Sequence, residues 1–182
     1  MWSVQGAKMQ KLLMVFLALL TPQIAVAKST EICRADANGQ ALDFWIGDWR
    51  VTDAKTGSFQ GEDRVERIQH GCGVVESWKG AEAGDEGTSL FFYDAVAHRW
   101  EQIWVTPDTS RPGGLKHKVQ IASYADGGTR FQGNLALPDG RIVIDRTTLT
   151  PLGDGRVHQL IELSKDGGAN WAVGFDAIYA PK

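Results

Sequence analysis

The stretch LDFWIGDWRV, residues 42–51, places two tryptophans, Trp45 and Trp49, four positions apart around Gly47. A tryptophan buries on the order of 200 Å² of surface, so two of them this close together indicate a point where a small domain closes its core. An alternating run with strand composition begins at Trp49. We therefore expect a short helical turn over Ala41–Ile46 that leads into the first strand and plugs one end of the fold.

Ten short runs with strand composition follow, separated by turns rich in glycine, aspartate and proline, such as Pro138-Asp139-Gly140 and Asp166-Gly167-Gly168. Strands at this spacing, with hairpin turns and no helical pattern between them, predict an all-β antiparallel domain. Adjacent hairpins favour a single up-and-down barrel, because closure removes exposed strand edges. The runs are Trp49–Ala54, Glu62–Gln69, Val74–Lys79, Thr88–Asp94, Arg99–Val105, Lys116–Ser123, Thr129–Ala136, Arg141–Leu149, Arg156–Ser164 and Trp171–Tyr179.

Residues 1–27 have the order of a secretory signal peptide: Lys8 and Lys11, the apolar run Leu12–Leu20, and a small-residue stop at Ala25-Val26-Ala27. The apolar run is shorter than the about 20 residues that a membrane span needs. We expect cleavage after Ala27 and a periplasmic or secreted protein; an uncleaved amphipathic helix is the alternative. The expected organisation is then an N-terminal arm and barrel-closing segment over 28–48, followed by a barrel domain over 49–182.

The charge balance excludes several classes of partner. Residues 1–27 contain two of the 19 basic residues and none of the 22 acidic ones, so the remaining chain has a formal net charge of −5. An acidic chain with no basic cluster argues against binding to nucleic acid or to anionic lipid surfaces. A second long apolar run is missing from the sequence, so we expect no membrane insertion. The oligomeric state stays open.

The two cysteines, Cys33 and Cys72, both follow the expected cleavage site. In an oxidising compartment two cysteines most simply form one disulfide, which here would fasten the N-terminal arm to the barrel. Two buried free thiols are the alternative.

Several of the predicted strands mix tryptophan with polar residues on one face. In Arg99–Val105, alternation places Trp100, Gln102 and Trp104 on the same side, and Glu76 and Trp78 share a face on an earlier strand. Such rows are typical of an enclosed, partly polar cavity for a small, mostly apolar ligand. The ligand-binding candidates are Glu76, Trp78, Trp100, Gln102, Trp104, Arg146 and His158; in the alternative interpretation the tryptophans are core residues and the polar residues face water.

Catalytic patterns are weak in this sequence. Glu76 and Glu162 are the candidate acids for a general acid–base reaction, but almost any β protein offers such a pair. The four histidines lie in four different runs or loops, without metal-ligand spacing, so we expect no metal site. A haem needs only one histidine, so haem stays an alternative to the expectation of no cofactor.

Four segments together resemble a bacterial family of domains of unknown function: DFWIGDWRV (43–51), GCGVVESW (71–78), RWEQIWV (99–105) and ELSKDGGANWAVGFDAIY (162–179). The family resembles calycins, which are barrels of the lipocalin or nitrobindin type with an N-terminal G-x-W signature, here Gly47-Asp48-Trp49. The resemblance implies that Trp49 packs across the closed end. Lipocalins bind small apolar or amphipathic molecules. Nitrobindins bind haem through a histidine near the C-terminus, and the last histidine here is His158.

Three hypotheses follow. The first is an exported barrel that binds a small ligand between Trp78, Trp100 and Trp104, with Glu76, Gln102 and Arg146 orienting a polar group. The second is an enzyme that uses Glu76 or Glu162 as general acid or base on such a ligand. The third is a structural barrel that is filled by its own side chains. The volume of the interior cavity separates the third hypothesis from the first two.

Overall fold

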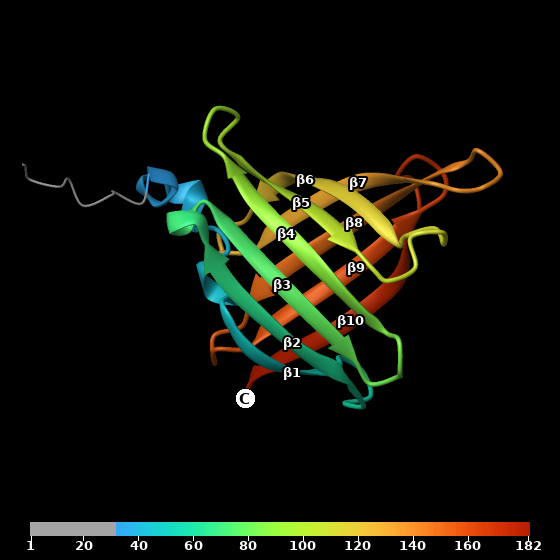
Figure 1. The fold of residues 1–182 in the computed structure, drawn as a ribbon, viewed down its shortest axis with the longest axis horizontal. Helices are drawn as coiled ribbons and strands as arrows, with labels where there is room; N and C mark the ends of the chain where they lie inside the picture. Colours follow the sequence, from blue (N-terminus) through green and yellow to red (C-terminus); the bar gives the residue numbers. More distant parts are fainter. Residues whose placement is uncertain (1–31) are drawn as a thin grey trace, which may run out of the picture.

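The computed structural model describes residues 32–182, and these residues form one closed antiparallel barrel of ten strands (Figure 1). Each strand pairs with its neighbours along the chain, and β1 closes the barrel against β10. The predicted all-β up-and-down barrel is therefore confirmed, while the predicted signal peptide, residues 1–27, lies outside the described residues. The strands are β1 (Gly47–Asp53), β2 (Phe59–Ile68), β3 (Gly73–Gly80), β4 (Glu86–Asp94), β5 (Arg99–Val105), β6 (Leu115–Ser123), β7 (Thr129–Ala136), β8 (Ile142–Pro151), β9 (Val157–Ser164) and β10 (Ala172–Pro181).

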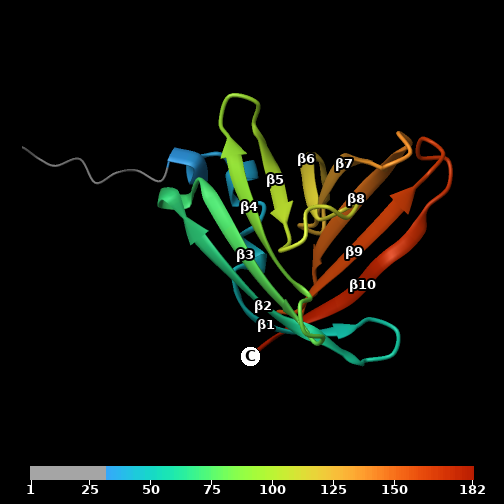
Figure 2. The same ribbon diagram turned by 45° about the vertical axis from the view of Figure 1, so that its right-hand side comes forward.

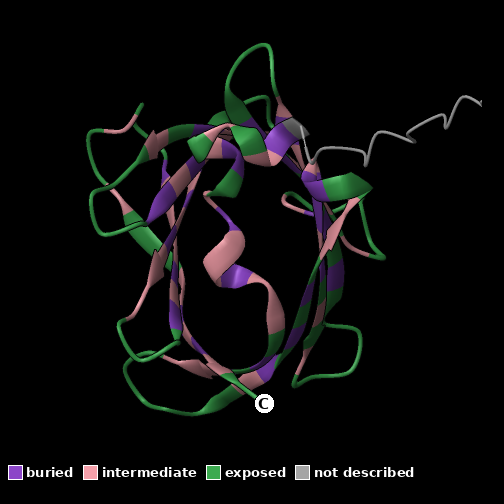
Figure 3. Cartoon of the chain, turned by 90° about the vertical axis from the view of Figure 1, so that its left-hand side faces the viewer, coloured by how far each residue is buried: buried purple, intermediate pink, exposed green. Residues whose placement is uncertain are grey.

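The N-terminal arm is more structured than predicted. In place of one turn over Ala41–Ile46 it contains three 3₁₀ segments: η1 (Ile32–Ala35), η2 (Ala37–Gln40) and η3 (Asp43–Trp45). Asp36 caps η2, because its carboxylate accepts a hydrogen bond from the backbone N–H of Asn38. A short helical segment lies across the opening of the barrel at this end (Figure 3).

The opening stretch of the sequence fills this closed end. The Trp45 side chain is 0% exposed and meets the rings of Phe91 and Tyr179 edge-on, at centroid distances of 5.3 and 6.4 Å. Trp49 donates a hydrogen bond of 3.0 Å from its indole N–H to the carbonyl of Trp45, and its ring lies over Gly47. The G-x-W sequence thus places an indole where any side chain at the glycine would crowd it.

The predicted disulfide is present. Cys33 on η1 is bonded to Cys72, with their Cα atoms 5.1 Å apart, just after the short 3₁₀ segment η4 (Gln69–Gly71) between β2 and β3. The bond therefore fastens the arm to the closed end of the barrel. Disulfides of this kind persist in oxidising compartments, in agreement with an exported protein.

The opposite end carries the hairpins 54–58, 81–85, 106–114, 137–141 and 165–171, and we call it the open end (Figure 2). Within residues 32–182, none of the helical segments has the length and apolar character needed to cross a bilayer. The closed end contains the tryptophans of the packed core, and interior space remains in the open half.

Candidate functional site: a cavity in the open half of the barrel

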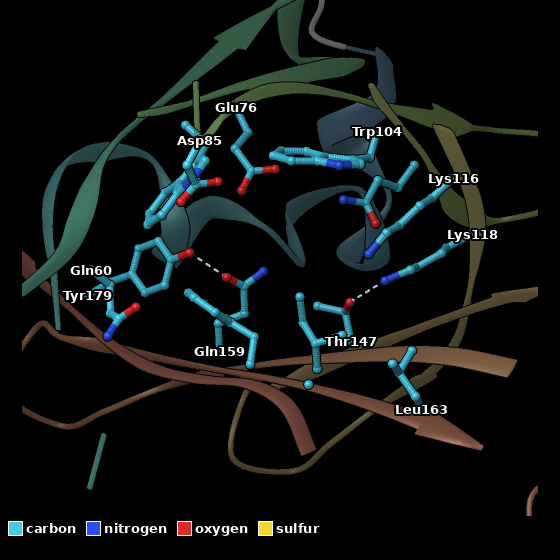
Figure 4. Close-up of a pocket in the computed structure, with 15 residues that line it drawn as sticks. Gln60, Glu76, Asp85, Trp104, Lys116, Lys118, Thr147, Gln159, Leu163 and Tyr179 are labelled. Carbon is cyan, nitrogen blue, oxygen red and sulfur yellow. Dashed lines mark hydrogen bonds between the residues drawn. The ribbon is translucent and has the colours of Figure 1, made fainter. Parts of the chain in front are cut away.

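A cavity of about 340 Å³ lies in the open half of the barrel (Figure 4). Its deeper part, which we call the floor, is polar, and the part nearer the open end, which we call the mouth, is mostly apolar. The floor consists of Glu76, Gln102, Lys118, Thr147, Gln159 and Tyr179. The mouth consists of Trp78, Trp104, Lys116, Ile161, Leu163, Gly174 and Phe175, with Gln60 and Asp85 at its rim.

Strand alternation explains four of these positions. On β3, Glu76 and Trp78 are two residues apart and point inward, and on β5 Gln102 and Trp104 do the same. Because β4 alone separates these strands, the four side chains reach one cavity from adjoining walls. All four were predicted from the sequence as ligand contacts, and the structure brings them together around the cavity.

The two mouth tryptophans each lie against a glycine of a neighbouring strand. A Cβ added to Gly87 on β4 would come within 2.3 Å of the Trp104 ring, and one added to Gly61 on β2 within 2.7 Å of the Trp78 ring. The rings therefore lie along the barrel wall and leave the centre open. Trp78 also meets Phe175 edge-on at 6.0 Å. The close approach of the Trp78 ring explains the glycine at position 61, within a strand. The strand β2 begins at Phe59, three residues before the predicted start at Glu62.

Two lysines of β6 converge on one carboxylate of β8. The Lys118 ammonium lies 2.5 Å from one oxygen of Asp145, and the Lys116 ammonium lies 2.9 Å from the other. Lys118 also donates a hydrogen bond of 2.6 Å to the Thr147 hydroxyl. We call Lys116, Lys118 and Asp145 the lysine cluster. To reach β8 the lysines cross β7 at Gly133, where a Cβ would lie 1.9 Å from a backbone oxygen of β6.

Lys118 is a buried lysine with a lowered pKa. The side chain is 3% exposed, and burial lowers the pKa of its amine to about 8, although the nearby Asp145 carboxylate favours the charged form. Burial of a cation is tolerable when a carboxylate pairs with it and hydrogen bonds satisfy its protons. Here a single carboxylate serves two ammonium groups.

The opposite wall carries two carboxyl groups, Asp63 on β2 and Glu76 on β3, which we call the carboxyl pair. Burial, and then the negative charge of Glu76, raise the pKa of Asp63 well above its usual range. Burial also raises the pKa of Glu76, while a hydrogen bond with Ser89 and the charge of Lys118 oppose this shift. The two groups cannot both ionise easily at this burial, so Asp63 keeps its proton when Glu76 is charged.

Two further floor residues add hydrogen-bonding groups. Gln102 donates from its amide nitrogen to Ser89 over 2.9 Å. Its amide oxygen is buried and accepts no hydrogen bond from any described residue. Tyr179 donates its hydroxyl to the Gln159 side-chain oxygen (Figure 4). Burial raises the pKa of Tyr179, so this hydroxyl remains a donor at neutral pH.

Arg146 and Glu162 do not line the cavity, in contrast to the predictions made for them. On β8 the buried positions are Asp145 and Thr147, so the neighbouring Arg146 faces outward. There its guanidinium pairs with Glu162 at 2.8 Å and stacks over the Trp171 ring at 3.6 Å. These residues fasten the 165–171 hairpin to the outside of the barrel.

His158 and Trp100 also lie away from the cavity. On β9 the neighbouring Gln159 is the inward residue, and His158 contacts Asp176 on the outer face at 2.6 Å. Trp100 points inward as expected but is 0% exposed at the closed end, where its indole donates to the Asn38 carbonyl. Of the seven predicted ligand contacts, Glu76, Trp78, Gln102 and Trp104 line the cavity.

Sequence reasoning missed most of the charged interior. On β6, Lys116, Lys118 and Gln120 recur at every second position, which is an available sign of an inward polar row. Lysines are normally exposed, so that row reads as a solvated face. The partner, Asp145, comes from a strand two places away, and no local pattern connects it with the lysines.

The histidines do not offer the cavity a haem or metal ligand. His117 and His158 lie on the outer face, and His70 and His98 lie at the closed end. Within residues 32–182 there is also no cluster of three histidine, cysteine or acidic side chains placed to hold a metal ion. His158, the last histidine of the sequence, thus pairs with Asp176 and does not face the cavity.

Comparison with known proteins does not identify a family. No protein-family model matches this sequence, and a search of curated proteins finds no similar sequence. We therefore infer the function from the chemistry of the cavity.

Proposed function

We propose that this protein is an exported binding protein that holds a small amphipathic molecule in the open half of its barrel. The observation that carries the proposal is the cavity itself, about 340 Å³, with a polar floor and a mouth of aromatic and aliphatic side chains. Small-molecule sites have volumes of about 300–1,000 Å³, apolar walls and a few convergent polar groups. A barrel filled by its own side chains would not contain such a space. The resemblance to calycin barrels supports the same proposal.

The ligand's apolar part lies between Trp78 and Trp104, and its polar end lies at the floor. Gln102, Gln159 and Tyr179 support this orientation, because they place hydrogen-bonding side chains at the floor. The charged groups of the floor favour an amphipathic ligand over the mostly apolar one expected from the sequence. An N-terminal segment with the order of a signal peptide and the Cys33–Cys72 disulfide support export.

The test is a fluorescence titration with N-phenyl-1-naphthylamine, an uncharged probe that brightens when it leaves water. We expect saturable binding to the wild type and binding at least about tenfold weaker to Gly174→Phe. Gly174 lines the mouth, at the register shift between β9 and β10, and a Cβ there makes only ordinary contacts with Leu163 and Ile161, so the strand has room for a larger side chain at the mouth. Glu101→Gln, on the outer face of β5, is the matched control. Equal affinity for all three proteins would contradict the proposal.

A second function, general acid–base catalysis, has one observation in its favour. Glu76 is 4% exposed, burial raises its pKa, and it faces Lys118 across the cavity. Such a carboxylate can remove a proton next to a carbonyl group while an ammonium stabilises the oxygen. Exchange of the α-protons of 2-decanone in D₂O, followed by NMR, tests this. Catalysis predicts faster exchange with the wild type than with Glu76→Gln, and equal rates would exclude it for this ketone.

A further inference from the structure

The lysine cluster has more positive charge than its own residues neutralise. Two ammonium groups share one carboxylate, and each ammonium has three N–H donors. Lys118 uses donors on Asp145 and Thr147, and its side chain is only 3% exposed, so water can do little to stabilise its charge; Lys116 is 20% exposed. A further anion within reach of these ammonium groups would stabilise a charge that is costly to bury unpaired.

The carboxyl pair lies across the cavity from this cluster. Glu76 lines the cavity and is close enough to both lysines for their charges to favour its ionised form. However, Lys116 and Lys118 both make their ion pairs with Asp145 on β8. The cavity thus has a positive wall and a negative wall.

Resting on the proposed function, we propose that the ligand is an amphipathic carboxylate, that its carboxylate pairs with the lysine cluster, and that its binding adds one proton to the carboxyl pair. An anion on the lysine cluster neutralises the charge that otherwise favours an ionised Glu76. It also brings a second negative charge into the same cavity. Taking up a proton removes this repulsion, because the pair becomes two neutral acids. The apolar chain then extends past Trp78 and Trp104 to the open end.

The uptake of this proton determines how the affinity for the carboxylate depends on pH. Below the raised pKa of Glu76 the pair is already neutral, and binding takes up no proton. As the pH rises above that pKa, the free protein loses the proton that the complex requires, so the affinity falls by up to about tenfold per pH unit. Above about pH 8 the Lys118 ammonium also loses its proton, and the fall becomes steeper. The charged or titratable groups that face Glu76 are Asp63 on β2, Asp85 at the rim, Lys116 and Lys118 on β6, Asp145 on β8 and Tyr179 on β10.

The first measurement compares head groups on one chain: decanoate, decanol and decylamine, each displacing N-phenyl-1-naphthylamine at pH 7.5. Lys118 is still mostly charged at this pH, because the pKa of its amine is about 8. We expect decanoate to bind at least about tenfold more tightly than decanol, and decylamine to bind most weakly. In Lys116→Met/Lys118→Met this preference should disappear while decanol still binds. Equal affinity of decanoate and decanol for the wild type would overturn this inference but leave the proposed function standing; a failure of the probe to bind would overturn both.

The second measurement determines how many protons the protein takes up when decanoate binds. Calorimetric titrations of decanoate in phosphate and in Tris buffer at pH 7.5 should differ by the heat of taking up as much as one proton. The isosteric variant Asp63→Asn/Glu76→Gln should take up none and bind decanoate at least as tightly as the wild type. Proton uptake that is unchanged in this variant would overturn the inference. Decanesulfonate, which stays ionised, provides a test without any substitution. The wild type should still take up a proton when it binds this ligand. If no proton is taken up with decanesulfonate, the proton taken up with decanoate goes to the ligand, and the inference is wrong.

Discussion

At the closed end of the barrel Trp45 and Trp100 are 0% exposed, whereas at the open end Trp78 and Trp104 are only partly buried and line a cavity. The residue type is the same, and the difference lies in what each indole meets. Trp45 meets the rings of Phe91 and Tyr179 edge-on and belongs to the packed core.

At the open end the indoles meet glycines. Trp78 lies against Gly61 and Trp104 against Gly87, so each ring fits into the wall of the barrel. The centre of the open half is left as a cavity with a polar floor and a mostly apolar mouth. One half of the barrel therefore stabilises the fold, and the other half provides the site.

The largest expected effect is on stability at the closed end. Trp45→Ala should lower the free energy of unfolding by about 3–5 kcal/mol, because it removes a fully buried indole and leaves a cavity. Trp104→Ala should cost only about 1 kcal/mol but weaken binding of the naphthylamine probe. Urea unfolding followed by circular dichroism measures both. Similar losses of stability in the two variants would show that the two halves do not differ in this way.

The disulfide should have the next largest effect. Cys33→Ser/Cys72→Ser frees the arm that covers the closed end, and loss of a disulfide typically costs about 2–4 kcal/mol. The affinity for the naphthylamine probe should remain near that of the wild type when measured well below the melting temperature. A strong loss of probe binding in the folded double variant would mean that the arm also shapes the open half.

The carboxyl pair should make stability depend on pH. The pKa values of Asp63 and Glu76 are raised in the folded protein, so their contribution is present below the unfolded pKa, about 4, and is lost as the pH rises through the folded values. The variant Asp63→Asn/Glu76→Gln should therefore gain in melting temperature relative to the wild type between pH 5 and pH 8. Loss of the Glu76 charge in the variant also lowers the pKa of Lys118, and this acts in the same direction, because a lysine with a lowered pKa favours the folded state increasingly as the pH rises. A constant difference across this range would contradict the assignment.

The smallest effect is expected on the outer face. Arg146→Gln removes the ion pair with Glu162 and the stacking on Trp171, which should cost about 1 kcal/mol. Because Arg146 lies outside the barrel, probe affinity should not change. A clear loss of affinity would place its side chain at the site after all.

Local sequence patterns predicted the barrel, the run of strands and the inward faces of β3 and β5. On these strands tryptophan marks the inner face, and glycine- and aspartate-rich turns mark the ends. The pattern failed on β8 and β9, where both faces carry apolar residues: Ile144 and Leu160 alternate with the inward Val143 and Ile161. Alternation then does not distinguish inside from outside, and Arg146, His158 and Glu162 were placed on the wrong side.

The charged interior was beyond local prediction for a different reason. The contact of Lys116 and Lys118 with Asp145 depends on β7 having no side chain at Gly133, and thus on three strands together. The raised pKa of Asp63 similarly depends on its burial beside Glu76 from the next strand. Only the closed barrel brings these groups together.

The most direct test uses the indole N–H signals in a ¹⁵N–¹H NMR spectrum, which report on the two halves separately. The described tryptophans are Trp45, Trp49, Trp78, Trp100, Trp104 and Trp171. Titration with N-phenyl-1-naphthylamine should shift the signals of Trp78 and Trp104 and leave those of Trp45, Trp49 and Trp100 in place. Shifts confined to the closed end or to Trp171, or no saturable shift of Trp78 and Trp104, would contradict a binding site in the open half.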